Sequence, residues 1–162
     1  MKHLMTYRIF ESEEDDSWRR RTDDTDLKDL SYEVDDILLD ISDDGFPYVQ
    51  PSLISRGKIE VEILGNDSGE ITNYDEFEIT KVVQDTLDRL YTHVTSRGYK
   101  CKIGLYFYGF DGFEKGYQVI FKNNKSYIVE EVGRTHSVVN RNVREVNLSE
   151  FEPDFIGITI EK

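Results

Sequence analysis

Residues 25–44 read TDLKDLSYEVDDILLDISDD, and this stretch decides the fold. Its apolar side chains recur in one stripe, made by Leu27, Leu30, Val34, Ile37, Leu38 and Ile41. A period near 3.6 residues with a single apolar side predicts an amphipathic helix. The apolar stripe of this helix must pack against a core, and most acids of the helix lie on the opposite side.

The rest of the chain reads mainly as strands. Aliphatic and charged residues alternate over 58–63, which predicts a strand with one buried face. A strand over 48–54 carries Pro51, a mark of a sheet edge or a bulge. A second amphipathic helix is predicted over 75–97, with Asn73 and Glu76 as capping residues and Gly98 after its end. Further strands are predicted over 99–108, 117–122, 126–132 and 155–160, the middle two joined by a hairpin. The stretch 109–116 is expected to be the glycine-rich loop of a hairpin, and 133–154 a long loop with a short strand near 143–146.

The predicted order is α-β-β-α-β-β-β-β, which indicates an α+β fold with two helices packed on one face of a mostly antiparallel sheet. Residues 1–24 are expected to form a charged N-terminal tail, and residues 25–162 a single domain. Trp18, beside three arginines in this tail, is expected to dock onto the domain.

The net charge is −13, and residues 1–50 alone carry −9. Direct nucleic-acid binding is disfavoured, because phosphate contacts need clustered Lys and Arg. No run approaches the ~20 apolar residues of a membrane span. Cys101 is the one cysteine, so no internal disulfide forms, and we expect a buried structural thiol in a cytoplasmic protein.

The acids of the first helix are the candidate partner-binding residues. They are Asp29, Glu33, Asp36, Asp40, Asp43 and Asp44. Carboxylates four residues apart repel one another on a helix, and Lys28 is the one base within it. Such a row predicts a basic protein partner, and it can imitate the charges of a phosphate backbone.

Catalytic signals are sparse. His93-Val94-Thr95 resembles one half of the paired His-x-Thr signature of two-histidine phosphoesterases, and this resemblance implies a small phosphoesterase-like enzyme. The other candidate, His136-Ser137-Val138, lacks a hydroxyl residue at its third position. No metal-ligand spacing and no phosphate-loop pattern is present, so no metal and no cofactor is predicted. Phe110 and Phe113 are expected to fold back on the core.

The N-terminus carries a second resemblance. Thr6-Tyr7-Arg8-Ile9-Phe10-Glu11 is similar to the capsid-targeting peptides of large tailed phages, which have a Thr-Tyr-x-x-Phe core followed by Glu. In that family the peptide directs a protein into the prohead and is cut after Glu. Here additional residues stand between Lys2 and Thr6. The resemblance implies a small accessory protein of such a phage, located in the host cytoplasm.

Three hypotheses follow. The first is a non-enzymatic phage-type accessory protein that binds a basic partner, for example as an inhibitor of a host nucleic-acid-binding or defence protein. The alternatives are a virion or head-internal structural protein and the phosphoesterase-like enzyme. A homodimer formed edge to edge is left open, with Pro51 disfavouring pairing at its own edge.

Overall fold

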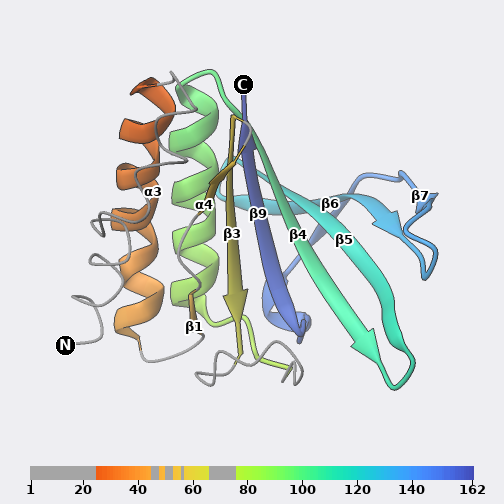
Figure 1. Cartoon of the computed structure of the whole chain (residues 1–162). Helices are drawn as coiled ribbons and strands as arrows, with labels where there is room; N and C mark the ends of the chain where they lie inside the picture. Colours follow the sequence, from red (N-terminus) through yellow and green to blue (C-terminus); the bar gives the residue numbers. More distant parts are fainter. Residues whose placement is uncertain (1–24, 45–47, 50–52, 56, 66–75) are drawn as a thin grey trace.

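The computed structural model describes residues 25–44, 48–49, 53–55, 57–65 and 76–162. Within them, two α-helices cover one face of a nine-stranded sheet (Figure 1). The predicted α+β class is therefore confirmed. The tail with its phage-like segment (residues 1–24), Pro51 and Asn73 lie outside the described residues, so the expectations that rest on them stay predictions.

The elements are bounded as follows. The helices are α3 (Thr25–Asp43), α4 (Lys81–Ser96) and the short 3-10 helix η2 (Leu148–Glu150). The strands are β1 (Tyr48–Val49), β2 (Leu53–Ser55), β3 (Lys58–Leu64), β4 (Lys100–Gly109), β5 (Gly112–Lys122), β6 (Lys125–Val132), β7 (Val138–Asn140), β8 (Arg144–Val146) and β9 (Phe155–Glu161).

The strand that comes last in the chain lies in the middle of the sheet. The order is β1-β3-β9-β4-β5-β6-β7, with β2 also paired to β3 and β8 also paired to β6. β9 is antiparallel to both β3 and β4. β3 and β4 therefore run parallel to each other, and α4 makes the crossover that parallel strands require. Figure 1 shows β9 between them in the layer beside the helices.

The core lies between the helix layer and one face of the sheet. The apolar stripe of α3 is buried, with Leu30, Val34 and Ile41 fully enclosed. In β3 the buried residues Ile59, Val61 and Ile63 alternate with exposed charged ones, as predicted. β9 continues the same inner face across the sheet. No helix of the described part of the chain covers the opposite face of the sheet.

The second helix starts later than its predicted boundary. α4 begins at Lys81 and is capped by Thr80, whose hydroxyl accepts a hydrogen bond from the Val83 N–H at 3.3 Å. The predicted helical start near residue 75, with Glu76 in its cap, is wrong, because residues 76–80 are not helical. There Phe77 is buried and Glu76 exposed, in the alternation typical of extended chain. The predicted end is confirmed by Gly98, which has φ +86°.

The stretch 109–116 forms a hairpin as predicted, but its loop is shorter than expected. Most of the stretch is strand, because β4 runs to Gly109 and β5 starts at Gly112, leaving a two-residue turn. This hairpin projects beyond the helices (Figure 1). The predicted hairpin between β5 and β6 is confirmed, with left-handed φ values of 53° and 58° at Asn123 and Asn124. β8 matches the short strand predicted near 143–146, and β7 was not predicted.

Candidate functional site

The six predicted partner-binding acids divide into two rows along α3. The inner row, Glu33 and Asp40, faces α4. The outer row consists of exposed residues, and its members are Asp29, Asp36, Asp43 and Asp44. Asp29, Asp36 and Asp43 are spaced by seven residues, as are Glu33 and Asp40, which keeps each set on one side of the helix; Asp44 follows directly after the helix end. The inner row is the one that faces the bases of α4.

The bases of α4 neutralise the inner row. Arg89 donates to Asp40 Oδ2 at 2.5 Å and to the Ile37 carbonyl oxygen at 3.2 Å. His93 Nε2 lies 2.6 Å from Glu33 Oε2, and the Arg97 guanidinium binds both Glu33 oxygens. Arg97, followed by His93, holds the pKa of Glu33 below its usual value of 4.5. These pairs tie the two helices together at their exposed edge.

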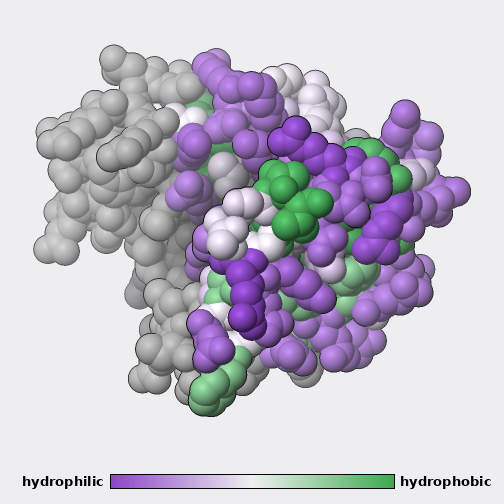
Figure 2. Space-filling view, turned by 90° about the vertical axis from the view of Figure 1, so that its right-hand side faces the viewer, coloured by the Kyte–Doolittle hydropathy of each residue, from purple (hydrophilic) through white to green (hydrophobic). Residues whose placement is uncertain are grey.

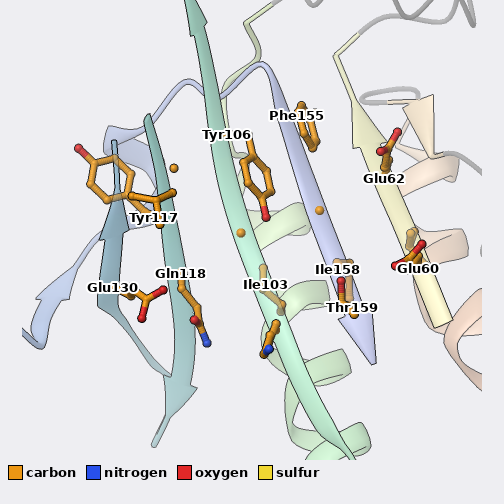
Figure 3. Close-up of a pocket in the computed structure, with 16 residues that line it drawn as sticks. Glu60, Glu62, Ile103, Tyr106, Tyr117, Gln118, Glu130, Phe155, Ile158 and Thr159 are labelled. Carbon is orange, nitrogen blue, oxygen red and sulfur yellow. The ribbon is translucent and has the colours of Figure 1, made fainter. Parts of the chain in front are cut away.

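The second candidate surface is the sheet face that the helices leave uncovered. It contains a hollow of about 400 Å³ that spans strands β3, β9, β4, β5 and β6. Figure 3 shows α4 behind the sheet, on the side opposite to the labelled polar side chains of this open-face hollow. The residues that project into it are Glu60, Glu62, Thr159, Lys102, Tyr106, Phe155, Gln118 and Glu130.

Glycines make the floor of the hollow. Gly157 pairs with Gly104 across β9 and β4, and Gly104 pairs with Gln118 on β5. The same row begins at Glu62 on β3 and ends at Glu130 on β6. Two successive positions of the row therefore carry no side chain, with long polar side chains at both sides. The Tyr106 side chain lies over both of these positions.

The Tyr106 ring covers this glycine floor. A Cβ atom at Gly104 would lie 2.7 Å from its ring and hydroxyl, and one at Gly157 would lie 2.9 Å from its ring. The ring also stacks on Phe155, with centroids 4.6 Å apart and planes 16° apart. Burial, followed by the neighbouring Tyr108 and Glu62, raises the pKa of the Tyr106 hydroxyl. Tyr106 thus forms an aromatic wall beside carboxylates.

Charges on the open face are segregated. Glu161 at one end of the sheet binds Lys58 at 3.1 Å and Lys102 at 3.7 Å. Glu130 lies 3.6 Å from Arg141. Glu60 and Glu62 are exposed and have no ion pair with any described residue. Glu161 therefore holds Lys58 and Lys102, and no base among the described residues forms an ion pair with the carboxylates on the β3 side.

The remaining candidate residues have structural surroundings. His93 lies on α4 against Glu33, and His136 stacks on Phe113 with ring centroids 4.3 Å apart. Cys101 is buried as predicted, and its burial raises the pKa of the thiol to about 12. Phe110 is wholly exposed at the β4–β5 turn, so the expectation that it folds back on the core is wrong. A two-residue turn that projects from the sheet leaves its side chain no core to reach.

No three His, Cys, Asp or Glu side chains among the described residues come close enough together to hold a metal ion. None of the helices in this part of the chain is both long and apolar enough to cross a membrane.

Comparison with known protein families, with curated proteins and with solved structures finds no significant match to this chain. Any functional argument therefore depends on the two surfaces.

Sequence reasoning found the acids of α3 but missed their pairing and the hollow. Arg89, His93 and Arg97 recur every four residues, which would have revealed a basic stripe on the second helix. Gly104 and Gly157 fall in strand positions that alternate with core residues, and glycine inside a strand often marks close approach of another group. That signal pointed to the open face.

Proposed function

We propose that this protein acts without catalysis, by binding a basic protein partner through acidic surface. One observation carries the proposal: the outer row of α3 is exposed along the whole helix, while the bases of α4 lie against the inner row. Seven carboxylates and one lysine occur within α3, and its last turn has no base. Like charges that repel one another in the free protein gain attraction when a positive surface approaches.

The ion pairs between the inner row of α3 and the bases of α4 change the kind of partner that fits. The five acids from Asp29 to Asp43 in the two rows would be spaced by about 5 Å along the helix axis, at 1.5 Å per residue. With the inner row neutralised, the spacing of the outer row is about 10 Å. This is close to the screening length at physiological salt. The favoured partner is therefore a protein whose basic residues are dispersed over its surface. The most specific candidate is a nucleic-acid-binding protein of the host, which this protein would inhibit.

Apolar contact contributes less to this proposal. Figure 2 shows the side with the β5–β7 strands as hydrophilic surface broken by small hydrophobic patches. Exposed apolar residues in and after β7 are Val138, Val139 and Val143. Patches of this size are usual on soluble proteins. We therefore expect association to depend on salt, and a phage-type accessory role would use it against a host or phage protein.

The test begins with capture of partners on the immobilised full chain. The affinity of each purified partner is then measured by calorimetry at 50 and 300 mM salt. We expect it to weaken about tenfold or more with salt, because the contacts are exposed charges. The triple variant D29N/D36N/D43N should weaken binding about tenfold at low salt, from roughly 0.5 kcal/mol per exposed pair.

The matched control is E78Q/D85N/E152Q, which removes three exposed acids that have no ion pair among the described residues. It should change the affinity less than twofold. An affinity that stays constant between the two salt concentrations, or falls equally in both triple variants, would reject the α3 surface as the binding site.

A further inference from the structure

A third surface lies where the sheet ends at β7, and its charge is opposite to that of the chain as a whole. β7 is the last strand in the order of the sheet, and no described strand pairs with its outer side. The segment 133–144, called here the basic edge segment, contains β7 together with Arg134, Arg141 and Arg144. It contains no Asp or Glu, although the net charge of the chain is −13.

The basic edge segment is accessible along its length. Every residue from 134 to 144 is exposed, and β7 is joined to β6 at two positions, through Val138 and Asn140. Figure 1 shows β7 at the opposite side of the molecule from α3. The unpaired N–H and C=O groups of an edge strand are a template for another extended chain. The outer side of β7 is therefore open to the addition of a further strand.

The arginines of this segment are weakly neutralised within the described residues. Arg134 lies 3.7 Å from Glu114, and its side chain is 67% exposed. Arg141 lies 3.6 Å from Glu130, and its side chain is 75% exposed. Arg144 has no ion pair with any described residue. Exposed pairs of this kind contribute little stability, so these arginines are free to exchange one carboxylate for another.

Charge and apolar contact together select the occupant. Val138, Val139 and Val143 are 40%, 63% and 65% exposed, and Figure 2 shows apolar patches bordered by hydrophilic surface on this side of the molecule. In strand addition, main-chain hydrogen bonds give affinity and side-chain contacts give specificity. A second copy of β7 would bring arginines against arginines, which is unfavourable. An extended segment that alternates acidic and apolar residues complements both the arginines and the valines.

We propose that β7 accepts an extended acidic segment of a partner protein as an additional strand, with carboxylates of that segment paired to Arg141 and Arg144. Charge complementarity and the open edge of β7 carry the inference. It does not use α3, so it goes beyond the proposed function and stands or falls separately from it. The protein would then bind a basic surface through α3 and an acidic segment through β7.

The test adds short peptides to the full chain and follows the amide NMR signals of residues 138–140. The probe is an acidic heptapeptide of alternating glutamate and valine. Two comparison peptides replace its glutamates with lysines or its valines with prolines. We expect saturable shifts and slower hydrogen exchange of the β7 amides with the acidic valine peptide, and neither effect with the lysine peptide. The proline peptide keeps the charge but lacks ladder donors, so its affinity should be about tenfold weaker.

Variants locate the binding site on the chain. R141Q/R144Q should weaken binding of the acidic valine peptide about fivefold, because two exposed ion pairs are lost. Both arginines are exposed, so the fold should survive. The matched control K28Q/K81Q removes two exposed lysines elsewhere and should leave the affinity within twofold. The α3 variant D29N/D36N/D43N should leave the shifts of residues 138–140 in place.

Three results would overturn the inference and leave the α3 proposal standing. They are an unchanged affinity in R141Q/R144Q, equal binding of the proline peptide, and peptide shifts that lie away from residues 138–140. The first would remove the arginines from the site, and the second would remove strand addition.

Other occupants have distinct signatures. If E11Q/E13Q/E14Q moves the signals of residues 138–140 without peptide, the chain's own acidic tail occupies the edge. If the same signals move with protein concentration alone, a second copy occupies it. If oligothymidylate moves them with an affinity equal to that of the acidic peptide, the segment binds nucleic acid. Each of these results would overturn a partner's acidic segment as the occupant.

Discussion

Replacing Gly104 with alanine should destabilise the protein through one contact, that with the Tyr106 ring. The added Cβ would lie 2.7 Å from ring atoms of Tyr106, and its three nearest neighbours all belong to that side chain. Because no real Cβ contact is that short, the ring must move, and it then loses its stack on Phe155. Gly157→Ala should act in the same way, since its Cβ would lie 2.9 Å from the same ring.

The size of the effect follows from two opposing contributions. Overpacking of a well-fitted site costs about 1–3 kcal/mol, which includes loss of an aromatic pair worth about 0.5–1.5 kcal/mol. Alanine also restricts the unfolded chain, which returns about 0.4–1 kcal/mol. We therefore expect G104A to lower the free energy of unfolding by about 1–2 kcal/mol. In a Tyr106→Ala background the clash is gone, and G104A should be neutral or stabilise by about 0.5 kcal/mol.

Urea denaturation followed by circular dichroism measures all four proteins of this double-mutant cycle. A coupling energy of about 2 kcal/mol is expected between the two positions. Gly98→Ala is the control for backbone strain: it meets no atom within 4 Å, but its φ is +86°. It should cost about 1 kcal/mol with or without Tyr106. If G104A costs the same in both backgrounds, Tyr106 is not what the glycine accommodates.

Three shorter predictions follow. Thr80→Ala should lower the free energy of unfolding by about 1 kcal/mol in urea denaturation, because the Val83 N–H loses its cap; Thr80→Ser should restore it. Glu33→Gln should destabilise at neutral pH by less than ~1 kcal/mol, because the pair is largely exposed. The pKa of Glu33 is lowered by folding, so its contribution is present above pH 4.5 and is lost as the pH falls below that value through the folded-state pKa. The urea midpoints of the two proteins should therefore approach each other as the pH is lowered, and a constant difference would contradict the pairing. The Cys101 thiol should react with iodoacetamide at pH 8 only after unfolding, because its pKa is raised to about 12, whereas rapid labelling of the native protein would show that it is accessible.

Hydrophobic periodicity was sufficient to predict the two layers of the fold. The stripe from Leu27 to Ile41 has a single helical period, and the alternation at Ile59, Val61 and Ile63 has a single strand period. Each pattern fixes both the type of element and its buried side. The failures came where two periods fit the same residues. Ile79 lies four residues before Val83 and two after Phe77, so it suits a helix or an extended chain, and Thr80 decides the boundary.

The candidate site was less predictable, because it depends on which elements face each other. Asp29 and Glu33 are both acids on α3, four residues apart, yet Arg97 on α4 neutralises the second. The sequence contains both charges but not the antiparallel packing of the helices that joins them. For the same reason the hollow could not be predicted from the sequence. It depends on the register of β9 between β3 and β4, which brings Gly157 beside Gly104. Contacts between distant segments are what periodicity cannot supply.

The open face also shows where this sequence gives up stability. Glycine within a strand costs about 0.5–1 kcal/mol relative to alanine, and β-branched residues suit such positions better. The Tyr106 ring recovers part of that loss by lying over both glycines, because a Cβ at either position would meet it. Glycine within a strand often marks the close approach of another group, and here that group is the ring of the chain's own Tyr106. Alanine or threonine at either position would displace the ring, so the gain in strand propensity would be offset by the lost aromatic stack on Phe155.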